Sequence, residues 1–382
     1  MKIAAVVCEY NPFHLGHQYQ LDTVRRLLNP DAIVGIMSGH FVQRGEPAVF
    51  SKQSRAAAAI KCGVDLVLEL PAVLTLQSAQ RYARNAIQTL HALGCVNTLF
   101  FGAESPDTEV LVQIAHVLAN EDAVFSRRLQ EELRRGLSFA SARAFVIKTI
   151  LGPASASILS QPNNILAVEY IKELLHLQSD IQPFAIARRG AGHDAAVPAD
   201  GFASASALRE MLSKGQDIHR YLPPDVSELF ALEQPFSVEN MEKELIANLC
   251  LMPLEVLRQT ADVSEGLEHA LKQAAFSADT LPQLISLVKS KRYAYSRIRR
   301  IVLNAYLGIT QKDTQLLPSY IRVLDFNETG QKILNLARKT ASLPLAKNGG
   351  QIKNLPDAQK LWRRELALDR VYALFQNADK KI

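Results

Sequence analysis

The sequence has few cysteines and no long apolar run, and both shortages narrow the class of protein. Its 382 residues include four cysteines, which lie far apart and form no CxxC pair, so neither a zinc knuckle nor a disulfide framework is indicated. No segment approaches the roughly 20 uninterrupted apolar residues that a membrane helix needs. We therefore expect a cytoplasmic protein with reduced thiols and no membrane partner.

The composition is that of a globular protein with a mild positive charge. Hydrophobic residues make up 48% and charged residues 21% of the chain, and its net charge is +5. The length allows one large domain or two ordinary ones. The apolar run at residues 1–8 is short, lacks a cleavage-site pattern and continues into Glu9, Asn11 and Pro12, so it indicates a strand and not a signal peptide.

Strand-like and helix-like segments alternate in the first half of the chain. The pattern predicts strands at residues 3–8, 32–37, 65–70, 98–101 and 183–186. It predicts helices at residues 52–62, 78–93 and 163–175, and an earlier one with Leu21, Val24, Leu27 and Leu28 on its apolar face. This alternation is typical of an α/β fold with a doubly wound parallel sheet.

The pattern changes near residue 235, after which strand-like runs disappear. Helical spacing continues through residues 241–252, 254–261, 266–276, 281–288 and 296–307. We therefore expect a first, α/β domain over residues 1–235 and a second, mostly helical domain over residues 236–382. The sequence does not indicate an oligomeric state.

The strongest chemical signal is the segment Asn11-Pro12-Phe13-His14-Leu15-Gly16-His17, between the first strand and the first helix. Ligands of doubly wound sheets bind beyond the carboxyl ends of the strands, and a helix N-terminus offers free N–H groups to a phosphate. Gly16 lets a nucleotide approach the backbone, and His14 and His17 can donate hydrogen bonds to a phosphoryl group. The alternative is a pair of surface histidines in a polar loop.

The motif resembles that of the HxGH nucleotidyltransferase superfamily, whose second motif is a Ser/Thr-rich helix start followed by a basic residue. The matching segment here is residues 203–209, Ala-Ser-Ala-Ser-Ala-Leu-Arg. Ser204 can cap a helix, while Ser206 and Arg209 could reach the β- and γ-phosphates. The alternative is an ordinary capped helix without a role in binding.

A closer resemblance covers most of the first domain. It rests on residues 7–14 (VCEYNPFH), 38–47 (SGHFVQRGEP), 65–71 (DLVLELP), 100–105 (FFGAES), 162–166 (PNNIL) and 187–192 (ARRGAG), with Lys52 and Arg55. Together these segments resemble the bacterial tRNA(Met) cytidine acetate ligase family. One residue departs from that pattern: we expect a small polar residue where His40 stands.

The resemblance implies a two-step reaction. Acetate attacks the α-phosphate of ATP to give acetyl-adenylate and pyrophosphate, and the N4 amine of the wobble cytidine of elongator tRNA(Met) then takes the acetyl group, forming N4-acetylcytidine. Residues 1–235 would form the ATP-binding catalytic nucleotidyltransferase-like domain and residues 236–382 the helical tRNA-binding domain. Mg²⁺ is expected with the triphosphate, although no carboxylate cluster marks a site for it.

The resemblance also implies the site residues. His14 and His17 would be catalytic, and an Asn of the Asn163-Asn164 pair and an Arg of the Arg188-Arg189 pair would contact ATP, with Asn163 and Arg188 favoured. The other ATP contacts implied are Gly102 and the stretch Val7, Cys8, Glu9, Tyr10, Asn11, Pro12, Phe13, His14, Leu15, Gly16, His17, Gln18, Tyr19 and Gln20.

The residue chemistry fits these roles but also allows others. Gly102 ends the fourth expected strand, so backbone alone would face the ligand there. Asn163 could read adenine or ribose through its amide, or simply cap a helix. Arg188 could hold a phosphate in a bidentate manner. Additional cations could come from Arg44, Lys52 and Arg55, unless these are solvated surface charges.

A second informative stretch runs from Lys289 to Arg300 and contains six cations, while residues 281–311 contain no acidic residue. A buried stripe of Ile298, Ile301, Val302 and Ala305 would leave Arg297, Arg299, Arg300 and Asn304 outside it. Cations interleaved with tyrosines suit an RNA backbone with stacked bases, whereas the alternative is a solvated basic helix face.

Two other functions compete with an RNA-modifying ligase. One is a nucleotidyltransferase that acts on a small phosphate substrate in coenzyme synthesis, and the other is a non-catalytic RNA-binding protein. The large helical second half favours the ligase over the first alternative, and the intact pair His14 and His17 favours catalysis over the second.

Overall fold

The computed structural model describes residues 1–188, 201–264, 266–290 and 293–376 of the chain. Its centre is a seven-stranded sheet with strand order β7-β6-β1-β2-β5-β8-β9. Neighbouring strands run parallel except for β5 and β8, which pair antiparallel. The strands are β1 (Ile3–Cys8), β2 (Ala32–Ser38), β5 (Leu66–Leu70), β6 (Thr98–Ala103), β7 (Gln182–Ala187), β8 (Ile321–Phe326) and β9 (Leu345–Ala346). The doubly wound α/β fold is thus confirmed.

Helices cover the sheet and extend beyond its ends. The first group comprises α1 (Leu15–Leu28), α2 (Lys52–Lys61), α3 (Ala72–Thr75), α4 (Ala79–Leu93), α5 (Thr108–Ala119), α6 (Ala123–Arg134), α7 (Phe139–Leu151), α8 (Pro153–Ile158) and α9 (Pro162–His176). The second comprises α10 (Ala205–Ser213), α11 (Pro224–Ala231), α12 (Glu239–Leu251), α13 (Leu254–Arg258), α14 (Leu267–Ala275), α15 (Leu281–Val288), α16 (Tyr295–Tyr306), α17 (Glu328–Thr340) and α18 (Pro356–Gln376). No helix among these residues is long and apolar enough to cross a membrane.

The two faces of the sheet form two cores, as the alternation of side chains along a strand requires. Ala4 and Val6 of β1 pack with residues of α1, α2, α10 and α11 on one face. Ile3 and Ala5 pack with residues of α4, α5, α9 and α17 on the other. Helix α1 buries Leu21 and Val24 as expected, but Leu27 is 58% exposed, so its predicted place on the same apolar face was wrong.

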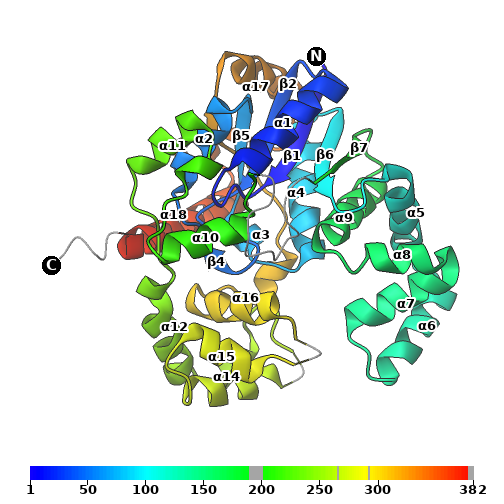
Figure 1. The fold of residues 1–382 in the computed structure, drawn as a ribbon, viewed down its shortest axis with the longest axis vertical. Coiled ribbons are helices and arrows are strands. Elements are labelled where there is room, and N and C mark those ends of the chain that lie inside the picture. Colours follow the sequence, from blue (N-terminus) through cyan, green and yellow to red (C-terminus); the bar gives the residue numbers. More distant parts are fainter. Residues whose placement is uncertain (189–200, 265, 291–292, 377–382) are drawn as a thin grey trace.

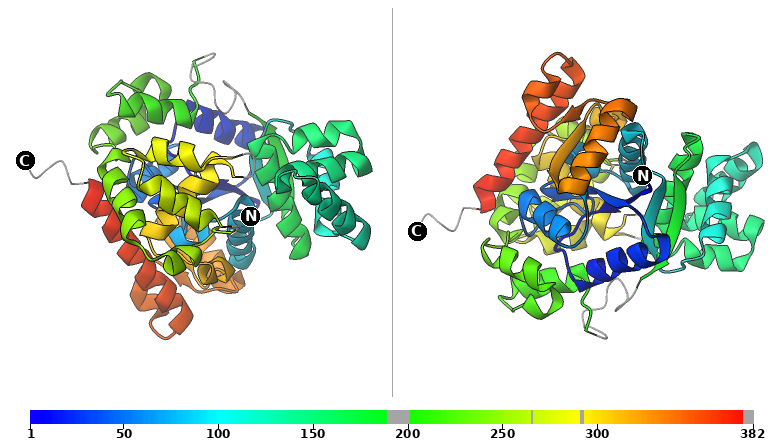
Figure 2. Two further views of the ribbon diagram at one scale, coloured as in Figure 1. Left: turned by 90° about the horizontal axis from the view of Figure 1, so that it is seen from below. Right: turned by 90° about the horizontal axis from the view of Figure 1, so that it is seen from above.

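The helices α12 to α16 gather beyond the carboxyl ends of the strands, while α17 lies at the opposite end of the sheet (Figure 1). Figure 2 shows α5 to α8 on one side of the molecule and α18 on the other. Helices α12 to α16 confirm the helical spacing expected after residue 235.

The expectation that strands end before residue 236 is wrong. Strand β8 pairs with β5 over Leu66–Glu69, and β9 pairs with β8. Helix α17 then packs beside β5, where Asn327 caps the helix and its amide donates to Asp65 Oδ1 at 2.9 Å. The last part of the chain therefore completes the sheet that the first part begins.

We predict that Gly330→Ala will strongly destabilise the protein, because α17 packs against the backbone just before β5 and leaves no room for a side chain at this position. A Cβ at this position would lie 2.0 Å from the carbonyl oxygen of Asp65. Such overpacking should lower the free energy of unfolding by about 3 kcal/mol, measured by urea denaturation. Lys332→Ala, at an exposed position of the same helix, should change it by less than about 0.5 kcal/mol. Equal stability of the two variants would contradict this packing.

Candidate functional site

A cavity of about 190 Å³ opens at the carboxyl ends of β1 and β6. The chain winds from β1 toward β2 and β5 on one side and returns to β6 and β7 on the other, so β1 and β6 border the point where the winding direction reverses. The described lining residues are Val7, Cys8, Glu9, Tyr10, Asn11, His14, His17, Gln20, Gln43, Arg44, Tyr82, Phe101, Gly102, Asn163, Leu166, Tyr170, Arg188, Ser204, Ala205, Ser206 and Arg209.

Two histidines are oriented by the start of helix α1. The Nδ1 atom of His14 accepts a hydrogen bond from the Gly16 amide at 3.0 Å, and the Nδ1 atom of His17 accepts one from the His14 amide at 3.3 Å. The rings stack with centroids 3.8 Å apart. Because Nδ1 is the acceptor in both neutral rings, each carries its proton on Nε2, where it can be donated to a ligand.

Both histidines are held neutral. Burial, reinforced by the charges of Arg188 and Arg209, lowers the pKa of His14 to about 3. Burial, with His14 and Arg188 nearby, lowers the pKa of His17 well below its usual range. At neutral pH the pair therefore offers two N–H donors without adding charge of its own.

Three guanidinium groups bring positive charge to the cavity. Arg209 of α10 donates to the Asn11 carbonyl at 2.9 Å and to Ser206 Oγ at 3.2 Å. Arg188 follows β7, and its side chain packs against Gly102. Its Nη1 lies 3.5 Å from Asn163 Oδ1. Arg44 lies on the loop between β2 and α2. An anionic ligand matches this charge.

The second motif reaches the same cavity as the first. Ser204 caps α10 by accepting the Ala207 amide at 3.1 Å, as expected. Ser206 and Arg209 line the cavity one helical turn apart. The start of α10 therefore faces the start of α1 across the space that a ligand would occupy.

The asparagine pair divides into one half-buried member at the cavity and one fully buried member. Asn163 lines the cavity, and its amide donates to Glu104 Oε1 at 2.6 Å. Asn164 is fully buried and accepts the Ser105 amide at 3.0 Å. Asn163 is therefore available to a ligand and Asn164 holds the loop after β6. Arg189, the other member of the arginine pair, lies outside the described residues.

The stretch from Val7 to Gln20 lies only partly in the cavity wall. Val7, Cys8, Glu9, Tyr10, Asn11, His14, His17 and Gln20 line it, whereas Pro12, Phe13, Leu15, Gly16, Gln18 and Tyr19 do not. Phe13 is fully buried, and Gln18 donates to Asp22. Gly16 acts through His14, because an added Cβ would lie 2.8 Å from the imidazole Cε1.

Six wall residues have no role predicted from the sequence: Gln43, Tyr82, Phe101, Leu166, Tyr170 and Ala205. Gln43, Phe101 and Leu166 lie in segments that carried the family resemblance, and Ala205 lies in the second motif, which were the available signals for them. Tyr82 and Tyr170 lie on α4 and α9, where their spacing is that of ordinary core residues. Their place at the cavity depends on how two distant helices pack together.

Lys52 and Arg55 are not cavity cations, and that expectation was wrong. Both side chains are fully buried. Arg55 donates to the carbonyl oxygens of Phe50 at 3.0 Å and Ser38 at 3.1 Å, and to that of Glu9 at 2.5 Å. It therefore joins the carboxyl ends of β1 and β2, while Arg44 alone of the three cations reaches the cavity.

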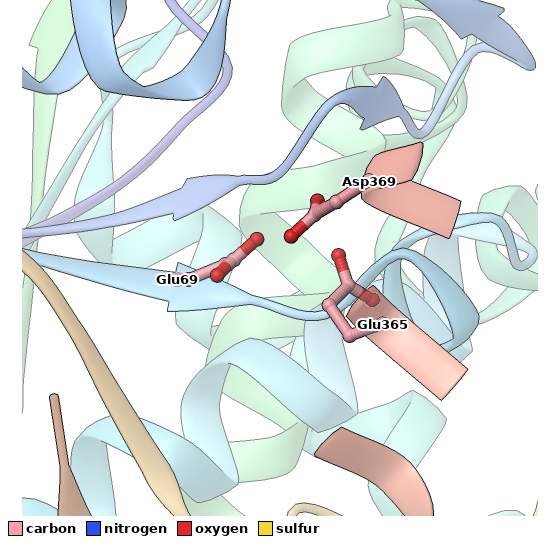
Figure 3. Close-up of side chains that lie close together, drawn as sticks. All are labelled: Glu69, Glu365 and Asp369. Atoms are coloured by element: carbon pink, nitrogen blue, oxygen red, sulfur yellow. The ribbon is translucent and has the colours of Figure 1, made fainter. Parts of the chain in front are cut away.

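Lys52 belongs to a separate charge cluster under the C-terminal helix α18. Glu69, Glu365 and Asp369 point toward one another there (Figure 3), with oxygens within 4.8 Å of each other. Lys52 Nζ lies 2.6 Å from both Glu69 and Asp369, and Arg322 Nε lies 2.8 Å from Glu69. An ammonium group thus takes the place that a metal ion would need, so the cluster is an ion network.

His40, which received no role from the sequence, joins this network. Its Nδ1 lies 2.8 Å from Asp369, and its ring stacks on Tyr372 with centroids 4.1 Å apart. Burial, with Glu69 close by, raises the pKa of Glu365 well above its usual range. Glu69 and Asp369 pair with Lys52 and Arg322, and these ion pairs hold α18 to the sheet.

The basic stretch on α16 differs from its expected arrangement. Arg300 and Asn304 are buried, Arg300 pairs with Asp262 at 3.2 Å, and Asn304 donates to the Leu76 carbonyl. Arg299 pairs with Glu46, and Arg297 donates to the Asp262 carbonyl at 3.0 Å. The expectation that all four lie outside the buried face was wrong. Lys291 and Arg292 of this stretch lie outside the described residues.

Comparison with known proteins agrees with this geometry. A family model described as HIGH Nucleotidyl Transferase matches residues 1–382. The chain belongs to the HIGH nucleotidyl transferase family.

Its relatives narrow the family further. A tRNA(Met) cytidine acetate ligase of Thermoanaerobacter pseudethanolicus is 38% identical over 387 residues, covering 98% of this chain and 95% of the relative. One of Clostridium botulinum is 37% identical over 360 residues, covering 90% and 88%. Thermotoga maritima TmcAL bound with alpha-thio ATP superposes with a TM-score of 0.91 at 35% identity, covering 98% of this chain and 95% of that one. Within its family, the chain therefore groups with the tRNA(Met) cytidine acetate ligases.

We predict that the buried, neutral His14 makes stability fall as the pH falls from 7 to 5. The unfolded chain takes up a proton as the pH passes 6.5, whereas the folded ring stays neutral down to about pH 3. Between pH 7 and pH 5 the free energy of unfolding of the wild type, measured by urea denaturation, should therefore fall by about 2 kcal/mol more than that of His14→Asn. The asparagine side chain can still cap α1. His116→Asn, at an exposed position of α5, should leave the wild-type pH dependence unchanged. Identical curves for wild type and His14→Asn would contradict the assignment.

Proposed function

We propose that this protein is an ATP-dependent ligase that acetylates N4 of the wobble cytidine in elongator tRNA(Met). The observation that carries the proposal is the pair of Nε2–H donors at the start of α1, facing Arg188 and Arg209 at the reversal point of the sheet. The relatives named tRNA(Met) cytidine acetate ligase, which match nearly the whole chain, supply the acetyl acceptor.

ATP fits the cavity through its triphosphate. His14 and His17 offer neutral donors, while Arg188 and Arg209 offer charge. Asn163 and the strand end at Gly102 would face the nucleoside. The alpha-thio ATP bound in Thermotoga maritima TmcAL supports this assignment.

In the first step a carboxylate oxygen of acetate bonds to the α-phosphorus, and pyrophosphate leaves with the electrons of the broken P–O bond. His14 and His17 stabilise the charge that grows on the phosphoryl oxygens, and the arginines stabilise the leaving pyrophosphate. In the second step the cytidine N4 attacks the acetyl carbonyl carbon, AMP leaves, and the amine loses a proton. Positioning by the fixed rings supplies most of the catalysis.

The cavity does not fit a magnesium ion held by the protein. Among its described lining residues Glu9 is the one carboxylate, and burial raises the pKa of that group. Three arginines stand where further oxygen ligands would be needed. Any magnesium would therefore arrive on the triphosphate, and no step above depends on it.

The tRNA would approach over the helices beyond the strand ends, in residues 236–311. With Arg300 buried, the contacts that we propose among the described residues of the basic stretch are Lys289, Tyr295 and Arg297, of which Lys289 and Tyr295 are exposed. A cation and a tyrosine ring suit a phosphate and a base. The expected place of action is the cytoplasm.

The function is tested by mass spectrometry of nucleosides from tRNA incubated with the protein, ATP and isotopically labelled acetate. We expect labelled N4-acetylcytidine that requires both ATP and acetate. Release of pyrophosphate without acetate, on a small phosphate substrate, would instead support a coenzyme-forming nucleotidyltransferase. Failure of labelled acetate to enter tRNA under any of these conditions would refute the ligase.

We predict that His14→Asn will lower acetylation at least ~100-fold while leaving tRNA affinity within about 2-fold. The variant retains the cap of α1 but lacks the Nε2–H donor, and loss of one such donor typically costs 10²–10³ in rate. Single-turnover kinetics and filter binding measure the two quantities. Gln18→Ala, which lies on the same helix but outside the cavity, should retain activity. An active His14→Asn enzyme would remove His14 from the reaction.

The two asparagines should separate by phenotype. Asn163→Ala removes a cavity group and should weaken ATP binding about 10-fold without a large loss of stability. Asn164→Ala removes the buried partner of the Ser105 amide and should lower the free energy of unfolding by about 1–3 kcal/mol. Calorimetric ATP binding and urea denaturation would show the split, and the reverse pattern would exchange their roles.

A further inference from the structure

A short hairpin connects the cavity to the helices beyond the strand ends. Strands β3 (Phe41–Val42) and β4 (Glu46–Pro47) pair antiparallel, and the turn between them carries Arg44 and Gly45. Gly45 has φ +79°, and an added Cβ would lie 2.4 Å from the Arg300 amide nitrogen of α16. The turn therefore packs directly on the backbone of that helix, so the hairpin and α16 are fixed to each other.

Glu46 lies between two arginines from distant parts of the chain. Its Oε1 is 3.0 Å from Arg209 Nη2, and its Oε2 is 2.9 Å from Arg299 Nη1. Arg299 also donates through Nε to the Arg44 carbonyl at 2.9 Å. One carboxylate thus joins a cavity arginine on α10 to an arginine on α16, which does not line the cavity.

The three groups are largely shielded from water. Their side chains are 18% exposed for Arg209, 13% for Glu46 and 20% for Arg299. Burial favours the neutral form of Glu46, but Arg209, Arg299 and Arg44 outweigh it and lower the pKa of the carboxyl. Glu46 is therefore charged, and both of its ion pairs persist at neutral pH.

A negative charge beside a triphosphate site needs a reason. By Coulomb's law alone, Glu46 would repel ATP and weaken its binding. The geometry offers the reason. Glu46 restrains the long Arg209 side chain in advance, so less conformational freedom is lost when this arginine binds a phosphate.

We propose that Glu46 is a positioning residue of the adenylation step, which, braced by Arg299 of α16, aims the Arg209 guanidinium at the triphosphate. The inference rests on the proposed use of ATP. It assigns α16 a part in the first chemical step, in addition to any contact that residues 236–311 make with tRNA. Arg299, Glu46 and Arg209 together form the arginine brace.

The test is Glu46→Gln in the full-length protein, with two readouts that need no tRNA. Acetate-dependent exchange of labelled pyrophosphate into ATP reports the adenylation step, and calorimetry reports ATP affinity. We expect exchange to fall about 10-fold or more, because a charge-assisted contact is lost. If the charge of Glu46 acts only by repulsion, its removal should tighten ATP binding and leave exchange intact or faster, which would overturn the proposal.

Glu46→Asp separates charge from reach. The aspartate retains the negative charge but is one methylene shorter, so it should not span Arg209 and Arg299, and exchange should fall as in Glu46→Gln. This variant also decides the matter if Glu46→Gln does not fold. Wild-type exchange in Glu46→Asp would show that charge without the bridge is sufficient and would refute positioning.

Arg299→Gln tests the second half of the arginine brace through non-additivity. If Arg299 acts through Glu46, the double variant Glu46→Gln/Arg299→Gln should exchange pyrophosphate within about 2-fold of Glu46→Gln alone. If instead the fold-losses of the two single variants multiply in the double variant, Arg299 acts independently of Glu46 and does not belong to the arginine brace.

Glu268→Gln is the matched control. It breaks an ion pair of 2.9 Å with Arg258 within the helices beyond the strand ends, and neither residue lines the cavity. Exchange should stay at the wild-type level. Absence of acetate-dependent exchange in the wild type would refute the proposed function itself, whereas wild-type exchange in Glu46→Gln would refute the arginine brace alone.

Discussion

The site depends on one constraint: the Nδ1 atoms of His14 and His17 are already occupied by backbone amides at the start of α1. Because both imidazoles are held neutral, this leaves each ring a single proton, on Nε2, and a fixed direction in which to donate it. The turn after β1, the small Gly16 and the cap of α1 all serve that orientation. The same few residues end a strand, begin a helix and set the tautomer of two functional groups.

Much of the sheet and the centre of the site could be predicted, because both depend on local sequence. Buried parallel strands such as β1 and β2 are continuous apolar runs, and the HxGH segment carries its own cap. Strand β8 could not be predicted, since Arg322 and Asp325 interrupt its apolar pattern. The Arg322 side chain is only 11% exposed there, and Glu69 and Asp369, distant in the sequence, balance its charge.

The same limitation explains the error on α16. The sequence around Arg299 and Arg300 has no nearby acid, which favoured a surface that binds RNA. Their acidic partners, Glu46 and Asp262, come from other parts of the chain. Absence of local acids therefore says little about whether an arginine is free, because ion pairs form across the fold and their desolvation cost favours well-paired partners when groups are buried.

The pairing of β8 with β5 also bears on how the chain folds as it is made. Leu70 ends β5, yet the strand that covers this edge starts only at Ile321. Until then a nascent chain presents an open edge with the buried carboxylate Glu69 lacking Arg322, a state exposed to wrong pairing. A protein cut at residue 235 would retain that open edge permanently, because the strand that pairs with β5 comes from the last part of the chain.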